Sequence, residues 1–170
     1  PDKSFFELID GLEPFISSAN IQRQQIGCVV VGSQNPFAFS GIDNIAAKVC
    51  GRLGISGAKS LLVDTASSSG ASAFEAAYLQ IASGQHDHVL AIGVQKMSGV
   101  STREATRIVA GVIDREEAEY GLTMPACGAL VAQALIDEFG LTPTQWTEFT
   151  AGWTERAQRL AVKNPDAHLK

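Results

Sequence analysis

Three short apolar runs, separated by helical patterns, determine the fold that this sequence predicts. Residues 27–32 (Gly-Cys-Val-Val-Val-Gly), 60–63 (Ser-Leu-Leu-Val) and 89–94 (Val-Leu-Ala-Ile-Gly-Val) carry almost no polar side chains. Such runs are typical of strands that are buried on both faces of a parallel sheet. Residues 70–83, between the last two runs, combine good helix formers with apolar residues in every turn. Strand, helix and strand in this order predict a βαβ crossover with parallel strands.

Helical patterns also precede and follow this core. Ser4, with Glu7 three residues later, predicts a capped helix that Pro14 kinks or restarts. Residues 33–40 predict a loop, and residues 42–53 predict a helix that ends near Gly54. Beyond residue 99 the sequence is more charged, and we expect 102–119 to be helical in part. An apolar helix should follow over 126–139, started by Met-Pro and ended by glycine, with further helix after residue 142.

The junction between the second run and its helix carries the candidate chemistry. Residues 63–70 read Val-Asp-Thr-Ala-Ser-Ser-Ser-Gly, so the strand should pass into the helix without a loop. The first N–H groups of a helix lack intrahelical partners and favour an anion or a developing oxyanion. The serines can be simple helix caps, or Ser67 can be a nucleophile. Thr65 and Ser69 occupy the glycine positions of the esterase pattern G-x-S-x-G, which disfavours a serine hydrolase.

A longer stretch resembles a known family. Residues 64–98 run from Asp-Thr-Ala-Ser-Ser-Ser-Gly, through an alanine-rich helix, to Gly-Val-Gln-Lys-Met-Ser. This resembles the thiolase superfamily, and within it the sterol-carrier-protein-type thiolases, whose typical motifs are Ala-Cys-Ala-Ser-Gly and Gly-Val-Glu-Lys-Met. A second block, Tyr-Gly-Leu-Thr-Met-Pro-Ala at 120–126, resembles the Gly-Leu-Thr-Met-Pro-Ala segment of the same subgroup.

The resemblance implies an α/β fold, the N-terminal half of the layered thiolase fold, with a mostly parallel sheet between helices and a helical loop-domain insertion. We expect a partial N-terminal α/β domain over residues 1–98 and an incomplete loop domain over 99–170. A whole thiolase subunit has two similar halves, and its catalytic histidine and second cysteine lie in the other half. At 170 residues, the chain is expected to be a fragment, with a naturally split enzyme as the alternative.

The implied activity is carbon–carbon bond formation or cleavage on acyl-CoA, by acyl transfer or by thiolysis of a 3-ketoacyl-CoA. Ser67 takes the position of the family's acyl-accepting cysteine, and a hydroxyl without a dedicated base is a far weaker nucleophile than a thiolate. The alternatives are therefore an engineered variant, a thiolase-like aldolase or lyase, and a non-catalytic half-subunit. The candidate catalytic residue is Ser67.

Four further residues are candidate substrate or CoA contacts by the same resemblance: Met124, Arg103, Arg107 and Gly70. Either arginine can meet a phosphate through charge-assisted hydrogen bonds, and a solvated mixed-charge face is the simpler alternative. Met124 is a candidate wall of the acyl pocket or an ordinary core residue.

Composition and charge disfavour several classes of function. The net charge of −5 does not indicate binding to nucleic acid, and no apolar run reaches the length of a membrane span. Three widely spaced cysteines disfavour a disulfide framework, and a cytoplasmic location is the expectation. His86 and His88 invite a metal interpretation, but alternate residues need not converge on one point, so we expect no metal.

The expected substrate is a CoA thioester, with no bound cofactor. The expected assembly is a homodimer or a hetero-oligomer, including one with an OB-fold acyl-CoA-binding subunit.

Overall fold

A computed structural model describes residues 3–165 and 167 of the chain, which falls into two compact units, Pro1–Val112 and Ile113–Lys170. The first unit contains α1 (Phe5–Asp10), α2 (Glu13–Ser18), the 3-10 turn η1 (Arg23–Gln25), β1 (Cys28–Gly32), α3 (Pro36–Ser40), α4 (Ile45–Arg52), β2 (Lys59–Val63), the 3-10 turn η2 (Ala66–Ser68), α5 (Ser69–Ala82), β3 (Val89–Gly93) and α6 (Thr102–Ala110). The second unit contains α7 (Arg115–Glu119), α8 (Met124–Phe139) and α9 (Pro143–Ala161).

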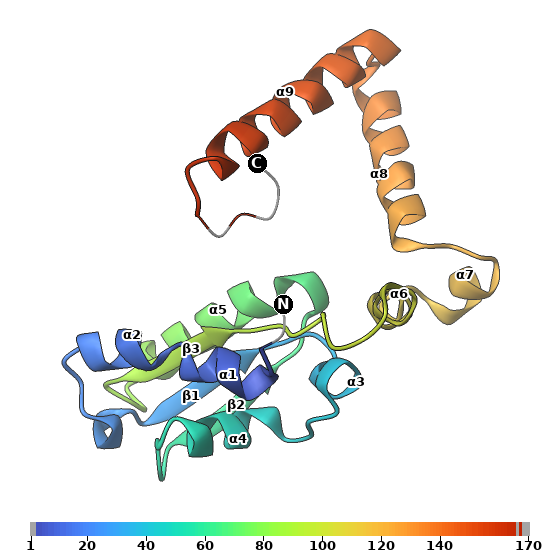
Figure 1. Cartoon of the computed structure of the whole chain (residues 1–170). Helices are drawn as coiled ribbons and strands as arrows, with labels where there is room; N and C mark the ends of the chain where they lie inside the picture. Colours follow the sequence, from blue (N-terminus) through green and yellow to red (C-terminus); the bar gives the residue numbers. More distant parts are fainter. Residues whose placement is uncertain (1–2, 166, 168–170) are drawn as a thin grey trace. The chain divides into compact units, whose positions relative to one another are not determined.

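The three strands form one parallel sheet with β1 in the middle (Figure 1). Val30 of β1 lies opposite Leu61 of β2 and Ala91 of β3, so the carboxyl ends of all three strands reach the same edge. The predicted α/β class and the parallel βαβ connection from β2 through α5 to β3 are confirmed. The mixed fold with its three-stranded parallel sheet between helices agrees with an N-terminal thiolase domain.

Helices cover both faces of the sheet (Figure 1). On one face Val29 and Val31 pack among side chains of α1, α2 and α4, including Ile9 and Val49. On the other face Cys28 and Val30 pack against Ala73 and Ala77 of α5. Side chains alternate along a strand, and every residue of β1 is buried, as expected for a strand covered on both sides. The prediction that Cys28 is a small core residue is confirmed.

Two local predictions were wrong. The expected loop 33–40 contains the short helix α3, with Pro36 in its first turn and Phe39 as its buried residue. The strand β2 does not run directly into α5, because the 3-10 turn η2 separates them. The predicted capping box is confirmed: Ser4 N donates to Glu7 Oε2 at 2.7 Å, and Glu7 N donates to Ser4 Oγ at 3.3 Å.

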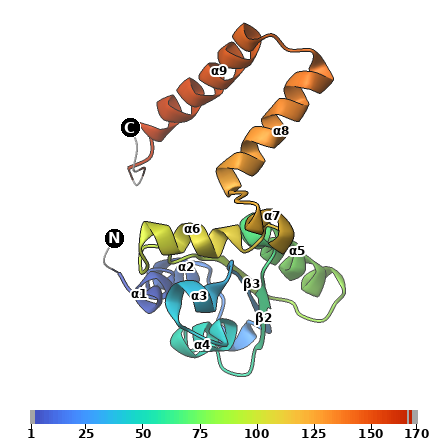
Figure 2. The same cartoon turned by 90° about the vertical axis from the view of Figure 1, so that its right-hand side faces the viewer.

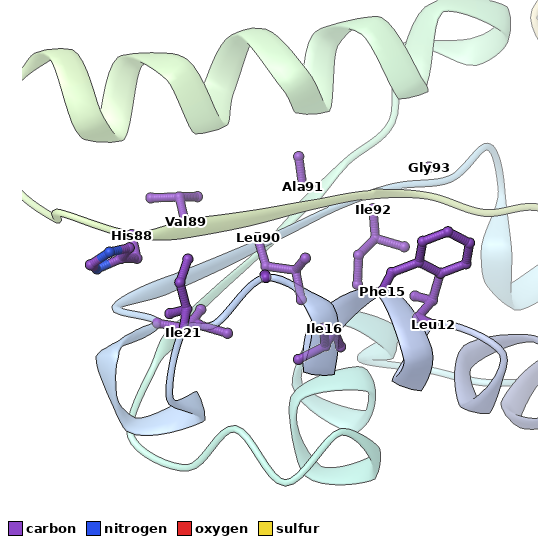
Figure 3. A pocket seen from close by; sticks show the side chains of 12 residues that line it. Leu12, Phe15, Ile16, Ile21, His88, Val89, Leu90, Ala91, Ile92 and Gly93 are labelled. Atoms are coloured by element: carbon purple, nitrogen blue, oxygen red, sulfur yellow. The ribbon is translucent and has the colours of Figure 1, made fainter.

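A cavity of about 370 Å³ lies along β3 (Figure 3). Leu90 and Ile92 point to the side on which Ile16 and Leu12 lie, whereas Ala91 points to the opposite side of the strand (Figure 3). The lining is apolar apart from His88, and none of the candidate site residues contributes to it. This cavity therefore brings together no catalytic side chains.

The remaining helices begin and end near the residues that the sequence predicted. α6 lies beside α3 in both views of the first unit (Figures 1 and 2). In the second unit α8 begins at Met124-Pro125 and ends at Gly140, which has the left-handed conformation (φ 58°). Thr142 and Gln145 form a capping box at the start of α9. Within the described part of the chain, no helix combines the length and apolar character needed to cross a membrane.

Candidate active site

A cavity of about 330 Å³ lies where β1 and β3 end and α5 begins. In open parallel sheets, ligands bind outside the carboxyl ends of the strands, beside helix N-termini. Ser67 and Gly70, two of the predicted site residues, are brought together here. The lining consists of Gly32, Ser33, Gln34, Ala66, Ser67, Ser69, Gly70, Gly93, Val94 and Gln95.

The three consecutive serines have different surroundings. The buried Ser69 hydroxyl donates to Ala66 O at 2.7 Å and accepts from Thr65 N at 3.0 Å. The Ser68 hydroxyl donates to Thr65 O at 2.8 Å. Ser67 is exposed, and its hydroxyl makes no hydrogen bond with any described residue. The turn therefore uses the hydroxyls of Ser68 and Ser69, and it leaves that of Ser67 available to a ligand.

The backbone that presents Ser67 is strained and braced. Ala66 has φ 53°, a left-handed conformation that costs a non-glycine residue about 1–2 kcal/mol. Asp64 braces this turn, since Oδ1 accepts from Ala66 N at 3.1 Å and Oδ2 accepts from Asn35 N at 2.8 Å. The Ser68 and Ser69 N–H groups donate to Thr65 O and Ala66 O. The 3-10 turn thus pairs two of the N–H groups that the sequence pattern had left free for an anion.

Glycine at the end of β1 allows α5 to approach the sheet closely. A Cβ on Gly32 would lie 2.3 Å from Ser69 O and 2.9 Å from Ala73 Cβ. No side chain tolerates such distances to backbone, so only glycine fits at position 32 without a shift. Gly93 is in ordinary contact with the first turn of α5, since a Cβ added to Gly93 would lie 3.6 Å from Gly70 Cα. The first turn of α5 thus rests directly on the strand ends.

Two glutamines and a serine complete the wall of this cavity. Gln95 Oε1 accepts from Ser33 Oγ at 3.1 Å and from Gln34 N at 2.9 Å, which joins the segments that follow β3 and β1. The Gln34 Nε2 atom is buried and has no hydrogen-bond partner among the described residues. None of these three residues was predicted from the sequence as part of the site. Their position directly after predicted parallel strands was the available signal.

The other predicted site residues lie elsewhere. Arg107 forms a two-bond ion pair with Glu104, at 2.6 and 3.0 Å, and hydrogen bonding in this pair raises the pKa of Arg107 and lowers that of Glu104. Arg103 is exposed on α6, and neither arginine lines the Ser67 cavity. Met124 is the first residue of α8 in the second unit and is half-buried. Their proposed contacts with substrate stay predictions.

No lining residue of the Ser67 cavity is charged or carries a basic side chain. His86 and His88 precede β3, at the end of the strand opposite the cavity. Among the residues that the structure describes, no group of three or more His, Cys, Asp or Glu side chains could hold a metal ion. Cys28 and Cys50 are buried, and burial raises the pKa of both thiols, which disfavours the nucleophilic thiolate form.

Comparisons with known proteins identify the family of this chain. The family model described as thiolase, N-terminal domain, matches residues 9–169. An acetyl-CoA acetyltransferase of Methanocaldococcus jannaschii is 32% identical over 145 residues, which cover 85% of this chain and 36% of that protein. An acetyl-CoA acetyltransferase of Methanothermobacter thermautotrophicus is 30% identical over 131 residues, 76% of this chain and 34% of that protein.

The chain spans about a third of the length of these relatives. The family match nevertheless extends over nearly the whole of it, including the Ser67 turn and both described units. The chain therefore belongs to the thiolase family, in the region of that family's N-terminal domain.

Proposed function

We propose that the protein is a thiolase-like acyltransferase that forms or cleaves a carbon–carbon bond in CoA thioesters, with Ser67 holding the acyl group. The observation that carries the proposal is the hydroxyl of Ser67, which is exposed in the cavity and not used by the turn, unlike those of Ser68 and Ser69. The names of the two relatives, both acetyl-CoA acetyltransferases, support the substrate class.

In the cleavage direction, Ser67 Oγ would bond to C3 of a 3-ketoacyl-CoA as the hydroxyl proton passes to a base. The C2–C3 bond then breaks, and its electron pair passes to C2 of the departing acetyl-CoA enolate, which takes up a proton. The thiol of free CoA finally attacks the acyl carbonyl, the bond from the acyl carbon to Oγ breaks, and the thiol proton passes to Oγ, which restores the Ser67 hydroxyl. The positive end of the α5 dipole favours the oxyanion that forms in each transfer. This chemistry needs no metal and no cofactor other than CoA itself.

Thiolysis of acetoacetyl-CoA by CoA tests this proposal. Replacing Ser67 by alanine removes the only proposed acyl acceptor, so turnover should fall by about a thousandfold or more. Ser68→Ala is the matched control, because it removes a neighbouring hydroxyl that only bonds within the turn, and it should keep most of the activity. Equal turnover by the wild-type protein and Ser67→Ala would refute an acyl-enzyme at this position.

A thiolase-like lyase is the second candidate, because no basic side chain in the cavity lining can activate the Ser67 hydroxyl as a nucleophile, and a lyase reaction needs no such nucleophile. In a retro-aldol reaction a base takes the proton of the 3-hydroxyl group, the C2–C3 bond breaks, and the thioester enolate is protonated. No covalent bond to Ser67 is required. Retro-aldol cleavage of a 3-hydroxyacyl-CoA, at equal rates in the wild-type protein and Ser67→Ala, would establish this alternative.

Assembly and location are proposed only from the resemblance. A homodimer, or a hetero-oligomer with an OB-fold acyl-CoA-binding subunit, and a cytoplasmic location both stay predictions.

A further inference from the structure

Two residues beside the Ser67 cavity have a left-handed backbone although neither is glycine, and one carboxylate holds both of them. Asn35 has φ 43° and Ala66 has φ 53°. Asp64 Oδ2 accepts from the Asn35 N–H at 2.8 Å, and Asp64 Oδ1 accepts from the Ala66 N–H at 3.1 Å. Asn35 follows β1 and Ala66 follows β2, so this side chain joins the segments that leave two neighbouring strands.

Of these two residues, Ala66 depends more on such a hydrogen bond. Asparagine tolerates the left-handed region because its short polar side chain bonds locally, whereas the Cβ of alanine comes too close to a carbonyl oxygen there. A backbone conformation of this kind persists only where surrounding contacts hold it. The Asp64 carboxylate is a strong acceptor for the Ala66 N–H, so it favours a conformation that alanine disfavours by itself.

The conformation of Ala66 matters for Ser67, which follows it directly in the turn η2. Both residues line the cavity. The Ser67 hydroxyl makes no hydrogen bond with any described residue, so its position depends on the backbone that carries it. Asp64 does not line the cavity, and its effect on a ligand there is therefore transmitted through the turn.

We propose that Asp64 is a positioning residue, whose carboxylate holds Ala66 in the left-handed conformation that directs Ser67 into the cavity. The inference rests on the proposed acyl transfer at Ser67, and it adds the group that keeps the hydroxyl in place for attack. A small displacement of a nucleophile slows the reaction strongly, whereas substrate binding through other groups is unaffected. Loss of the carboxylate should therefore lower kcat and leave KM unchanged.

Steady-state thiolysis of acetoacetyl-CoA by CoA tests the proposal. Asp64→Ala removes both hydrogen bonds, so kcat should fall by about tenfold at an unchanged KM. Asp64→Asn keeps the shape of the side chain but has one acceptor oxygen in place of two, so its kcat should lie between those of Asp64→Ala and the wild-type protein. This second variant also provides the comparison where Asp64→Ala does not fold.

Asp43→Ala is the matched control for these variants. Asp43 Oδ1 accepts from the N–H of Asn44 at 2.8 Å, and Asn44 is also left-handed, with φ 49°. Neither residue lines the Ser67 cavity. Asp43→Ala therefore removes a bond of the same kind away from the site, and it should keep the kcat of the wild-type protein.

A second change separates positioning from general stability. Glycine takes the left-handed conformation without steric cost, so adding Ala66→Gly to Asp64→Ala should recover most of the lost kcat. The thermal midpoint of each variant is measured alongside, so that every kcat refers to folded protein. A purely structural role of Asp64 would lower the thermal midpoint without changing the kcat of the folded protein.

Each other outcome has a defined meaning. Equal kcat in Asp64→Ala and the wild-type protein would overturn the role of Asp64 and leave the proposed function standing. A raised KM at constant kcat, or a loss of kcat that Ala66→Gly does not recover, would overturn the role in the same way. Absence of thiolysis by the wild-type protein would overturn the proposed function and this inference together.

Discussion

Gly32 is the residue on which the geometry of the Ser67 turn depends most directly. It is buried at the end of β1, and its missing side chain leaves the space that the Ser69 carbonyl occupies. Gly70, in the first turn of α5, is different, because a Cβ added there would meet nothing within 4 Å. Glycine is therefore required by close packing at position 32, whereas at position 70 it only adds backbone flexibility.

Gly32→Ala should lower the free energy of unfolding by about 1–3 kcal/mol, because the added methyl overpacks against backbone atoms. Gly70→Ala should raise it by up to about 1 kcal/mol, since alanine loses less backbone entropy in a helix. Urea denaturation of the three proteins measures both changes. Equal stability of the two variants would contradict the close approach of α5 to β1.

At this scale the sequence predicted Ser67 as the candidate catalytic residue, but it did not predict the residues that line the cavity beside it. Ser67 was identifiable because a resemblance aligns it with an acyl-accepting cysteine. Gln34 and Gln95 were not identifiable, because their pairing depends on which strand ends meet across the sheet, over 61 positions of sequence. The different hydrogen bonding of Ser67, Ser68 and Ser69 also depends on the left-handed conformation of Ala66, which no local sequence pattern favours.

Among the elements, α1 and α4 are joined by a two-bond ion pair. Arg52 Nε donates to Asp10 Oδ1 at 2.6 Å, and an Arg52 terminal nitrogen donates to Asp10 Oδ2 at 2.5 Å. The hydrogen bond from Arg52 holds the pKa of the Asp10 carboxyl below its ordinary value. The unfolded chain therefore takes up this proton at a higher pH than the folded chain does.

The stabilisation from this pair is present above the ordinary aspartate pKa and is lost as the pH falls below it. Asp10→Asn should be less stable than the wild-type protein near neutral pH, and the difference should shrink toward about pH 3. Asp87→Asn, on an exposed aspartate, is the control and should keep the wild-type acid dependence. Denaturant midpoints across this pH range provide the measurement, and an unchanged acid dependence of Asp10→Asn would exclude the pair as a contributor.

Among the helices and strands, those with a long sequence pattern were predicted correctly, and the shortest ones were missed. The strands were located to within one residue at each end, and α8 was delimited correctly by its proline and glycine. The five-residue α3 was missed because it is too short to show a helical period. The 3-10 turn before α5 was missed because it depends on hydrogen bonds between backbone and serine side chains that a propensity cannot encode.

At the scale of the whole molecule, several large apolar side chains are exposed to solvent. Phe74, Tyr78, Leu79 and Ile81 of α5 are exposed, Phe74 to 70%. Exposed apolar groups of this kind mark contact surfaces or sites of association. We therefore expect the purified chain to associate as its concentration rises.

Sedimentation velocity over a range of concentrations tests that expectation. Phe74→Glu should weaken association, because a charge replaces the most exposed aromatic ring of α5. Glu75→Gln, on the adjacent exposed residue, is the matched control and should leave association unchanged. A chain that stays monomeric at every concentration would contradict the expectation.

Intact-mass measurement of Ser67→Cys after exposure to acetyl-CoA tests the central claim, that position 67 holds the acyl group. A thiolate is a stronger nucleophile than a hydroxyl, so we expect one acetyl group on this variant, located at residue 67 by peptide mapping. Ser68→Cys is the control and should remain unmodified at residue 68, because Ser68 does not line the cavity. No adduct at residue 67, or equal labelling of the two variants, would contradict the assignment of Ser67.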